Sequence, residues 1–186
     1  LYSQALADGV RARLEQDAPD TYRVELAMTY GEPSVSAAID KLQASGARRL
    51  VVLPLYPQYS GTTTASVFDS VSTKLQSMRW IPEMRFINQY HDEPGYIGAL
   101  AASIREHWEQ NGKSEHLLFS FHGVPHYTLT GGDPYHCQCQ KTGRLVAEAL
   151  GLEAKDWTLS FQSRVGREEW LRPYTDETVA ELGKQG

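Results

Sequence analysis

A histidine at the end of an apolar run is the residue of this sequence best suited to chemistry. His122 stands in the segment LLFSFHGVP, where Gly123 lets the backbone turn closely and Pro125 prevents a strand from continuing. An imidazole in this place can ligate a borderline metal such as Fe²⁺ or accept protons near neutral pH. The local pattern fits equally well a histidine that is simply satisfied by a neighbouring backbone group.

A second candidate is the segment LPLYPQYSGTTTASV, residues 53–67. Its two prolines restrict the chain before a hydroxyl-rich helix start, whose free N–H groups could receive an anion such as a carboxylate. The segment has neither the spacing nor the lysine of a phosphate-binding loop, which argues against nucleotide binding. A rigid strand–helix corner capped by hydroxyls is an equally good interpretation.

Trp170 is the third candidate, in the segment SFQSRVGREEWLRPYTDET, between an expected strand end and an expected helix start. Arg167 and Arg172 flank it. An exposed aromatic ring beside guanidinium groups suits a flat, anionic, conjugated ligand. The alternative is a tryptophan that packs between two lobes.

Cys137, Cys139 and His136 lie together in DPYHCQCQ. A structural metal site needs about four ligands, and side chains two positions apart on a helix do not share a face. The two cysteines are also too few and too close for a disulfide framework. We therefore expect inert thiols at a helix start, in a reducing compartment.

Short β-rich runs alternate with longer amphipathic runs, which indicates an α/β fold with parallel sheets covered by helices on both faces. The expected strands cover residues 23–29, 49–53, 85–89, 115–121 and 157–162. The expected helices cover residues 3–16, 35–44, 63–77, 96–109, 138–150 and 175–184. Sheets of this kind bind ligands beyond the carboxyl ends of their strands, which is where the histidine and the tyrosine-rich segments fall.

Composition narrows the class of protein. The 186 residues carry a net charge of -5, which argues against a nucleic-acid partner. No apolar run approaches the roughly 18 residues of a membrane span. The first residues lack the apolar centre and cleavage site of a secretory signal, so the sequence favours the cytoplasm.

The runs LPLYPQYS, FSFHGVP, GDPY and FQSRVGREEWLRPYTDE resemble the ferrochelatases, in that order and at familiar separations. The resemblance implies insertion of Fe²⁺ into protoporphyrin IX with release of two protons, the terminal step of haem biosynthesis. It implies that His122 is the active-site histidine, which ligates the iron, accepts pyrrole protons, or both. It also implies that Tyr59, Ser60 and Trp170 bind the porphyrin.

The resemblance further implies two similar Rossmann-like lobes, both incomplete here. Residues 1–93 would be the remainder of the first lobe, and residues 94–186 a bridging helix with the first part of the second. The family's opening strand and the later acidic partner of the histidine have no counterpart in these 186 residues, so we expect this chain alone to be inactive. Some members hold a [2Fe–2S] cluster through a cysteine directly after YPQYS. Gly61 occupies that position here, so we expect no cluster and no cofactor beyond the iron substrate.

Other functions remain open at this point. One is a chelatase for another tetrapyrrole, such as coproporphyrin or sirohydrochlorin. Others are a non-catalytic porphyrin- or haem-binding protein and a ligand-binding lobe of the periplasmic type. The residues leave peripheral membrane association and the oligomeric state undecided.

Overall fold

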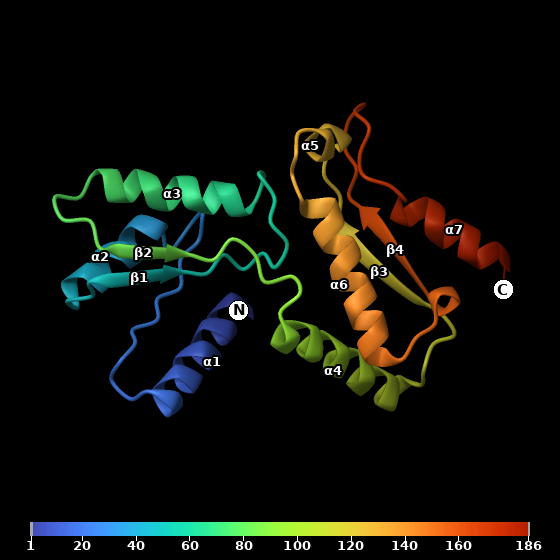
Figure 1. Ribbon diagram of the computed structural model, residues 1–186, viewed down its shortest axis with the longest axis horizontal. Coiled ribbons are helices and arrows are strands. Elements are labelled where there is room, and N and C mark those ends of the chain that lie inside the picture. Colours follow the sequence, from blue (N-terminus) through green and yellow to red (C-terminus); the bar gives the residue numbers. More distant parts are fainter. Residues whose placement is uncertain (1, 186) are drawn as a thin grey trace. The chain divides into compact units, whose positions relative to one another are not determined.

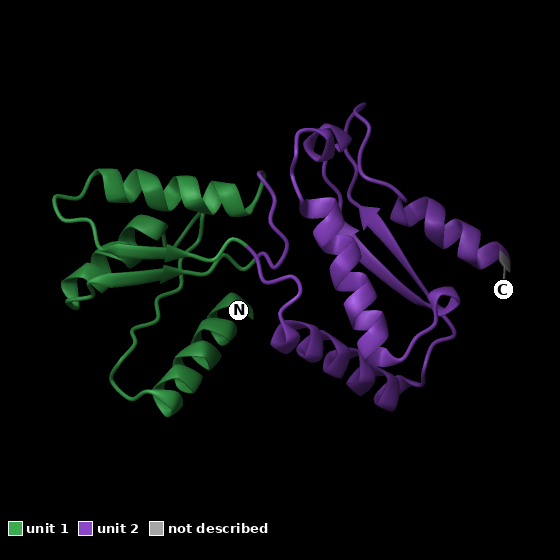
Figure 2. Ribbon diagram, in the orientation of Figure 1, with its two compact units in different colours: residues 1–55, 62–88 green, residues 56–61, 89–186 purple. Residues whose placement is uncertain are grey.

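The computed structural model describes residues 2–185, which form two compact units (Figure 2). Unit 1 contains the chain up to residue 55 together with residues 62–88. Unit 2 contains residues 56–61 and the chain from residue 89 onward. The domain division expected between residues 93 and 94 stays a prediction, because a compact set of contacts does not by itself define a folding domain.

Unit 1 is built on a two-stranded parallel sheet (Figure 1). Its elements are α1 (Tyr2–Asp17), α2 (Val35–Ala44), β1 (Arg49–Val52), α3 (Thr64–Gln76) and β2 (Glu83–Phe86). The caps of α2 follow its sequence signals. Ser34 accepts a hydrogen bond from the Ala37 amide at 3.2 Å, and Gly46 has the positive φ of +86° that favours glycine after a helix end.

The core of unit 1 lies between this sheet and the helices α2 and α3. It consists of Ile39, Leu50, Val71 and Leu75. Because side chains alternate along a strand, Val51 faces away from this core and is 64% exposed. Leu53, which follows β1, is likewise exposed.

Unit 2 has its own two-stranded parallel sheet, with Phe121 opposite Phe161 and His122 opposite Gln162. Its helices and strands are α4 (Pro94–Asn111), β3 (Leu117–His122), α5 (His126–Thr130), α6 (Tyr135–Leu150), a 3₁₀ turn η1 (Ala154–Asp156), β4 (Trp157–Gln162) and α7 (Thr175–Gln185).

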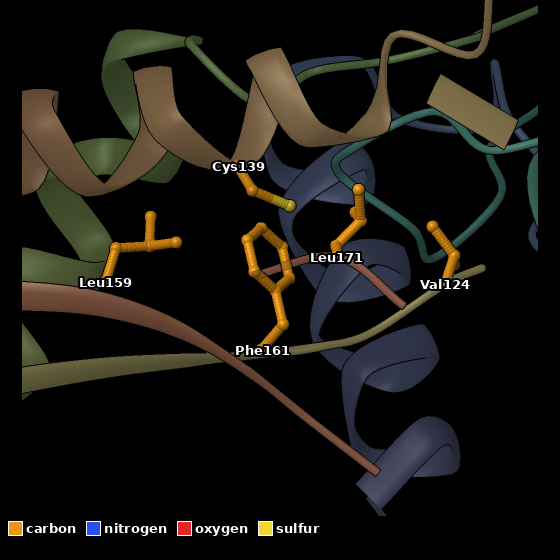
Figure 3. Close-up of a cluster of buried hydrophobic side chains, with 5 residues drawn as sticks. All are labelled: Val124, Cys139, Leu159, Phe161 and Leu171. Atoms are coloured by element: carbon orange, nitrogen blue, oxygen red, sulfur yellow. The ribbon is translucent and has the colours of Figure 1, made fainter. Parts of the chain in front are cut away.

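Helices cover both faces of the unit 2 sheet. On one face, α6 packs over an apolar cluster of Val124, Cys139, Leu159, Phe161 and Leu171 (Figure 3). The helix approaches closely because it carries Gly143, where a Cβ atom would lie 3.0 Å from Leu159 Cδ1. On the other face, the Ser160 hydroxyl of β4 lies 2.9 Å from the Thr175 hydroxyl of α7. Phe161 is only 2% exposed, so this face of the sheet is well covered.

Many of the expected boundaries shift by one to three residues in the structure, and α6, for example, begins at Tyr135 and not at residue 138. Residues 23–29 form no strand, and their only sheet contact within the described residues is a single bridge from Met28 to Ser34, because no described strand runs alongside them. Strand β2 lies two to three residues earlier than expected, since Glu83 is the residue that pairs with Arg49. The short helix α5 and the turn η1 were not expected. Within residues 2–185, no helix combines the length and apolar character of a membrane span.

Candidate active site

His122 is the last residue of β3, and its side chain is exposed. Its Nδ1 atom lies 2.8 Å from the carbonyl oxygen of Gly123. A carbonyl oxygen can only accept a hydrogen bond, so Nδ1 must carry the proton in this contact. In the neutral imidazole the lone pair is then on Nε2. His122 is therefore held in the form that can accept a proton or bind a cation at Nε2.

The turn after His122 is fixed by a close approach to β4. The Gly123 amide donates to the Gln162 carbonyl at 2.8 Å. A Cβ atom at position 123 would lie 2.9 Å from that same carbonyl oxygen and 3.2 Å from Trp170 Cε3. Only glycine fits here without displacing its neighbours, which gives the sequence motif a physical reason.

Trp170 lies beside this turn because the loop after β4 folds back onto the residues after β3. The Leu171 amide donates to the Val124 carbonyl at 3.0 Å, and the His126 amide to the Glu169 carbonyl at 2.8 Å. The indole Nε1 donates to the Val165 carbonyl at 2.9 Å, which fixes the ring orientation. Trp170 is half-buried, and all these contacts lie within unit 2.

The two arginines that flank Trp170 differ. Arg172 lies 3.6 Å from the Glu169 carboxylate and stacks 4.5 Å from the ring centre of Tyr174. Arg167 is exposed and makes no ion pair within the described part of the chain. Of the two, Arg167 is the guanidinium available to an anionic ligand.

The segment 56–61 is attached to unit 2 by side chains of α6 and of the turn before it. The Tyr59 amide donates to Gln138 Oε1 at 2.7 Å, and Gln58 Nε2 donates to the Thr142 hydroxyl at 3.0 Å. Gln138 and Thr142 are four residues apart, so they share one face of the helix. This network places Tyr59 and Ser60 in the same unit as His122 and Trp170.

Ser60 and Gly61 are held by Asp133, a residue that the sequence analysis did not single out. Asp133 Oδ2 accepts a hydrogen bond from the Ser60 hydroxyl at 2.9 Å and from the Gly61 amide at 2.7 Å. Ser60 itself is fully buried. The available signal was the GDPY motif, in which an acidic residue stands just before a helix start.

Tyr135 is a second supporting residue that the sequence analysis did not single out. Its hydroxyl donates to the His122 carbonyl at 2.9 Å, so it supports the strand end from the side of α6. Burial raises the pKa of this phenol above its usual value, which keeps it protonated and able to donate. Whether a substrate contacts the four residues singled out from the sequence stays a prediction; these are Tyr59, Ser60, His122 and Trp170.

Of the two cysteines, Cys139 belongs to the core of unit 2, whereas Cys137 is exposed. Burial raises the pKa of the Cys139 thiol to about 12, and its sulfur packs near the Phe161 ring (Figure 3). The His136 ring stacks on Phe161 with 5.6 Å between ring centres. Within residues 2–185, no group of three or more His, Cys, Asp or Glu side chains could hold a metal ion. The expected inert thiol at Cys139 is thus explained by packing.

Known proteins similar to this chain agree with the motifs. The family model described as Ferrochelatase matches residues 1–186. The chain is 54% identical over 179 residues to the ferrochelatase of Thioalkalivibrio sulfidiphilus, covering 96% of this chain and 48% of that protein. It is 49% identical over 185 residues to the ferrochelatase of Pseudoalteromonas atlantica, covering 100% of this chain and 51% of the relative. The chain thus spans about half the length of these curated relatives.

A solved structure shares the fold at low sequence identity. SirB from Bacillus subtilis with Fe³⁺ is similar with a TM-score of 0.63 and 14% identity, covering 96% of this chain and 66% of that one. Since the family model covers the whole sequence, and curated relatives match it at about half identity, this chain belongs to the ferrochelatase family.

Proposed function

We propose that the full-length protein carrying this sequence inserts Fe²⁺ into protoporphyrin IX, releasing two protons, as the last step of haem formation. The observation that carries the proposal is the state of His122. Its Nδ1–H is held by the Gly123 carbonyl, which leaves the Nε2 lone pair exposed at the carboxyl end of a strand. A half-buried indole, Trp170, lies against the next residue.

The chemistry needs such a group. Metallation must remove the protons of two pyrrole N–H groups and strip water from the iron. The Nε2 atom of His122 can take one proton or hold the metal, but a single lone pair cannot do both at once. Turnover then requires that the proton pass from His122 to another group or to solvent before the next step. A cleft that bends the macrocycle would expose a pyrrole lone pair and lower the barrier.

The porphyrin would be bound by Trp170 and by the segment that carries Tyr59 and Ser60. The flat indole offers an apolar face, and Arg167 offers a charge for a propionate. The Ser60 hydroxyl is buried against Asp133, so its contribution to binding would be to hold the loop in shape.

Porphyrin and ferrous iron are the partners in this proposal, and the iron is a substrate. Gly61 cannot supply a thiolate, so the proposal includes no iron–sulfur cluster at that position. A net charge of -5 supports the absence of a nucleic-acid partner. We place the reaction in the cytoplasm, a compartment that keeps Cys137 and Cys139 reduced.

The test is an anaerobic metallation assay of the full-length protein with protoporphyrin IX, coproporphyrin and sirohydrochlorin, each with Fe²⁺. We expect protoporphyrin IX to be metallated fastest, and His122→Ala to lower turnover by about 10²–10⁴-fold, the usual contribution of a proton-transfer group. The matched control is His107→Ala, because His107 is an exposed histidine on α4.

Two outcomes would contradict the proposal. Preference for sirohydrochlorin or coproporphyrin would assign the protein to another tetrapyrrole. Tight haem binding without metallation, unaffected by His122→Ala, would make it a carrier.

A further inference from the structure

We propose that Asp133 is a positioning residue, which sets the porphyrin-binding segment 59–61 and the strand end of His122 relative to each other. The inference rests on the proposed function for its kinetic part and on geometry for its structural part. A single carboxylate receives three donors from two segments. Oδ2 accepts from the Ser60 hydroxyl at 2.9 Å and the Gly61 amide at 2.7 Å, and Oδ1 accepts from the Tyr135 amide at 3.0 Å.

Asp133 is itself held in place. Its amide donates to the Thr128 carbonyl at 3.0 Å, which closes the turn after α5. Its carboxylate lies at the amino end of α6, where the helix dipole favours a negative charge. Asp133 is therefore a fixed base whose Oδ1 binds the helix start and whose Oδ2 binds the loop.

The connection to His122 runs through the next two residues. The Tyr135 amide is bound by Asp133 Oδ1, and the Tyr135 hydroxyl donates to the His122 carbonyl at 2.9 Å. The turn 133–135 thus contacts the porphyrin-binding segment on one side and the last residue of β3 on the other. A shift of this turn would change the distance between the groups that bind the porphyrin and the imidazole that acts on it.

The role differs from general support of the fold. The segment 56–61 has other attachments, from Gln138 and Thr142 of α6 and from the Tyr90 amide, which donates to the Pro57 carbonyl at 2.9 Å. The apolar cluster of unit 2 does not include Asp133. Losing the carboxylate should therefore loosen residues 59–61 locally while the β3–β4 sheet stays folded.

Asparagine cannot replace this aspartate, although it has nearly the same shape. In one orientation its amide nitrogen faces the Gly61 N–H, and in the other it faces the Tyr135 N–H. Either way a donor meets a donor, because an amide offers only one accepting oxygen. Asp133→Asn is therefore a sharp test, and Asp69→Asn is the matched control, since Asp69 is exposed on α3 and has no hydrogen bond or ion pair within the described residues.

The first measurement is hydrogen–deuterium exchange of the full-length protein without substrate. In Asp133→Asn we expect the peptide that covers residues 56–61 to exchange about tenfold faster, with peptides of β3 and β4 unchanged. In Asp69→Asn both should exchange as in the wild type. Unchanged exchange of 56–61 in Asp133→Asn would overturn the positioning role even if the protein proves to be a ferrochelatase.

The second measurement separates binding from turnover. Asp133→Asn should raise KM for the porphyrin about tenfold and lower kcat, with KM for Fe²⁺ changed less than about twofold. Ser60→Ala should raise porphyrin KM less. In the double variant the two effects should be less than additive, because both changes weaken the attachment of residues 59–61 to position 133. Additive effects, or loosened exchange with an unchanged porphyrin KM and kcat, would overturn the proposal.

Ser60→Ala also serves if Asp133→Asn does not fold, since it removes one hydrogen bond and leaves the carboxylate. Faster exchange at 56–61 together with a raised porphyrin KM in Ser60→Ala would then support the proposal, and wild-type behaviour would refute it. If the wild-type protein metallates no porphyrin, the proposed function fails. The exchange experiment still decides whether Asp133 holds the loop.

Discussion

Gly123 and Trp170 are packed so closely that the glycine has no room for a side chain: a Cβ atom at position 123 would lie 3.2 Å from Trp170 Cε3. The same atom would lie 2.9 Å from the Gln162 carbonyl oxygen. The residue next to His122 therefore limits how near the indole of Trp170 comes to the backbone at the end of β3.

Gly123→Ala should push the strand end and the Trp170 loop apart. We expect the free energy of unfolding to fall by about 1–3 kcal/mol, as for other overpacked sites, and iron insertion to fall with it. Gly98→Ala is the control, because a Cβ there meets nothing within 4 Å and alanine suits a helix interior. Urea unfolding of both variants measures the difference. Equal stability of the two variants would show that Gly123 is not tightly packed against Trp170 and Gln162 in solution.

The proton position on His122 can be observed directly. We expect the neutral ring to carry its proton on Nδ1, because that atom faces the Gly123 carbonyl. His107 should show the opposite tautomer, since its Nδ1 faces the Asn111 amide nitrogen, which can only donate, at 3.3 Å. Long-range ¹H–¹⁵N spectra of the neutral rings distinguish the two forms. A proton on Nε2 of His122 would remove the lone pair that the proposed function requires.

Trp170→Leu tests whether the indole of Trp170 binds the porphyrin. Losing the indole face should weaken porphyrin binding about tenfold, the effect of removing a well-packed aromatic contact. Porphyrin titration followed by tryptophan fluorescence gives the affinity, and the quenching should be smaller in the variant. Trp80→Leu is the comparison, because Trp80 is 62% exposed in unit 1. Equal affinities for the two variants would leave Trp170 with only a packing role.

His91 should make the stability depend on pH. Burial, and then the charge of Lys141, lowers the pKa of this imidazole, while the neighbouring Asp92 opposes the shift. Its Nδ1 atom is buried and has no hydrogen-bond partner within the described residues. A depressed pKa in the folded state means that protonation favours unfolding. Stability is therefore full above the unfolded value of about 6.5 and falls as the pH drops below it.

The check is the unfolding midpoint in urea at pH 7.5 and pH 5.0. The loss between the two should be smaller in His91→Gln than in the wild type. Some loss should remain, because burial also lowers the pKa of His136. An identical loss in both proteins would show that His91 does not titrate differently on unfolding.

Local signals in the sequence were enough to place the longer helices and the glycine turn next to His122. The helix Val35–Ala44 has the expected bounds because Ser34 and the positive-φ Gly46 cap it locally. Strand β4 also has the expected bounds, and the motif around His122 contains the glycine that the turn requires. These features depend on neighbours within a few residues, which periodicity and capping rules capture.

Tertiary structure decided which segments meet. Residues 56–61 follow the first strand in the chain, yet they pack with unit 2, because Asp133, 73 residues beyond Ser60, accepts the hydrogen bond from that hydroxyl. Residues 23–29 have the composition of a strand but form no sheet, because a strand needs a partner alongside it. Hydrogen bonds between residues far apart in the chain leave no period in the sequence, so the role of Asp133 became visible only in the folded structure.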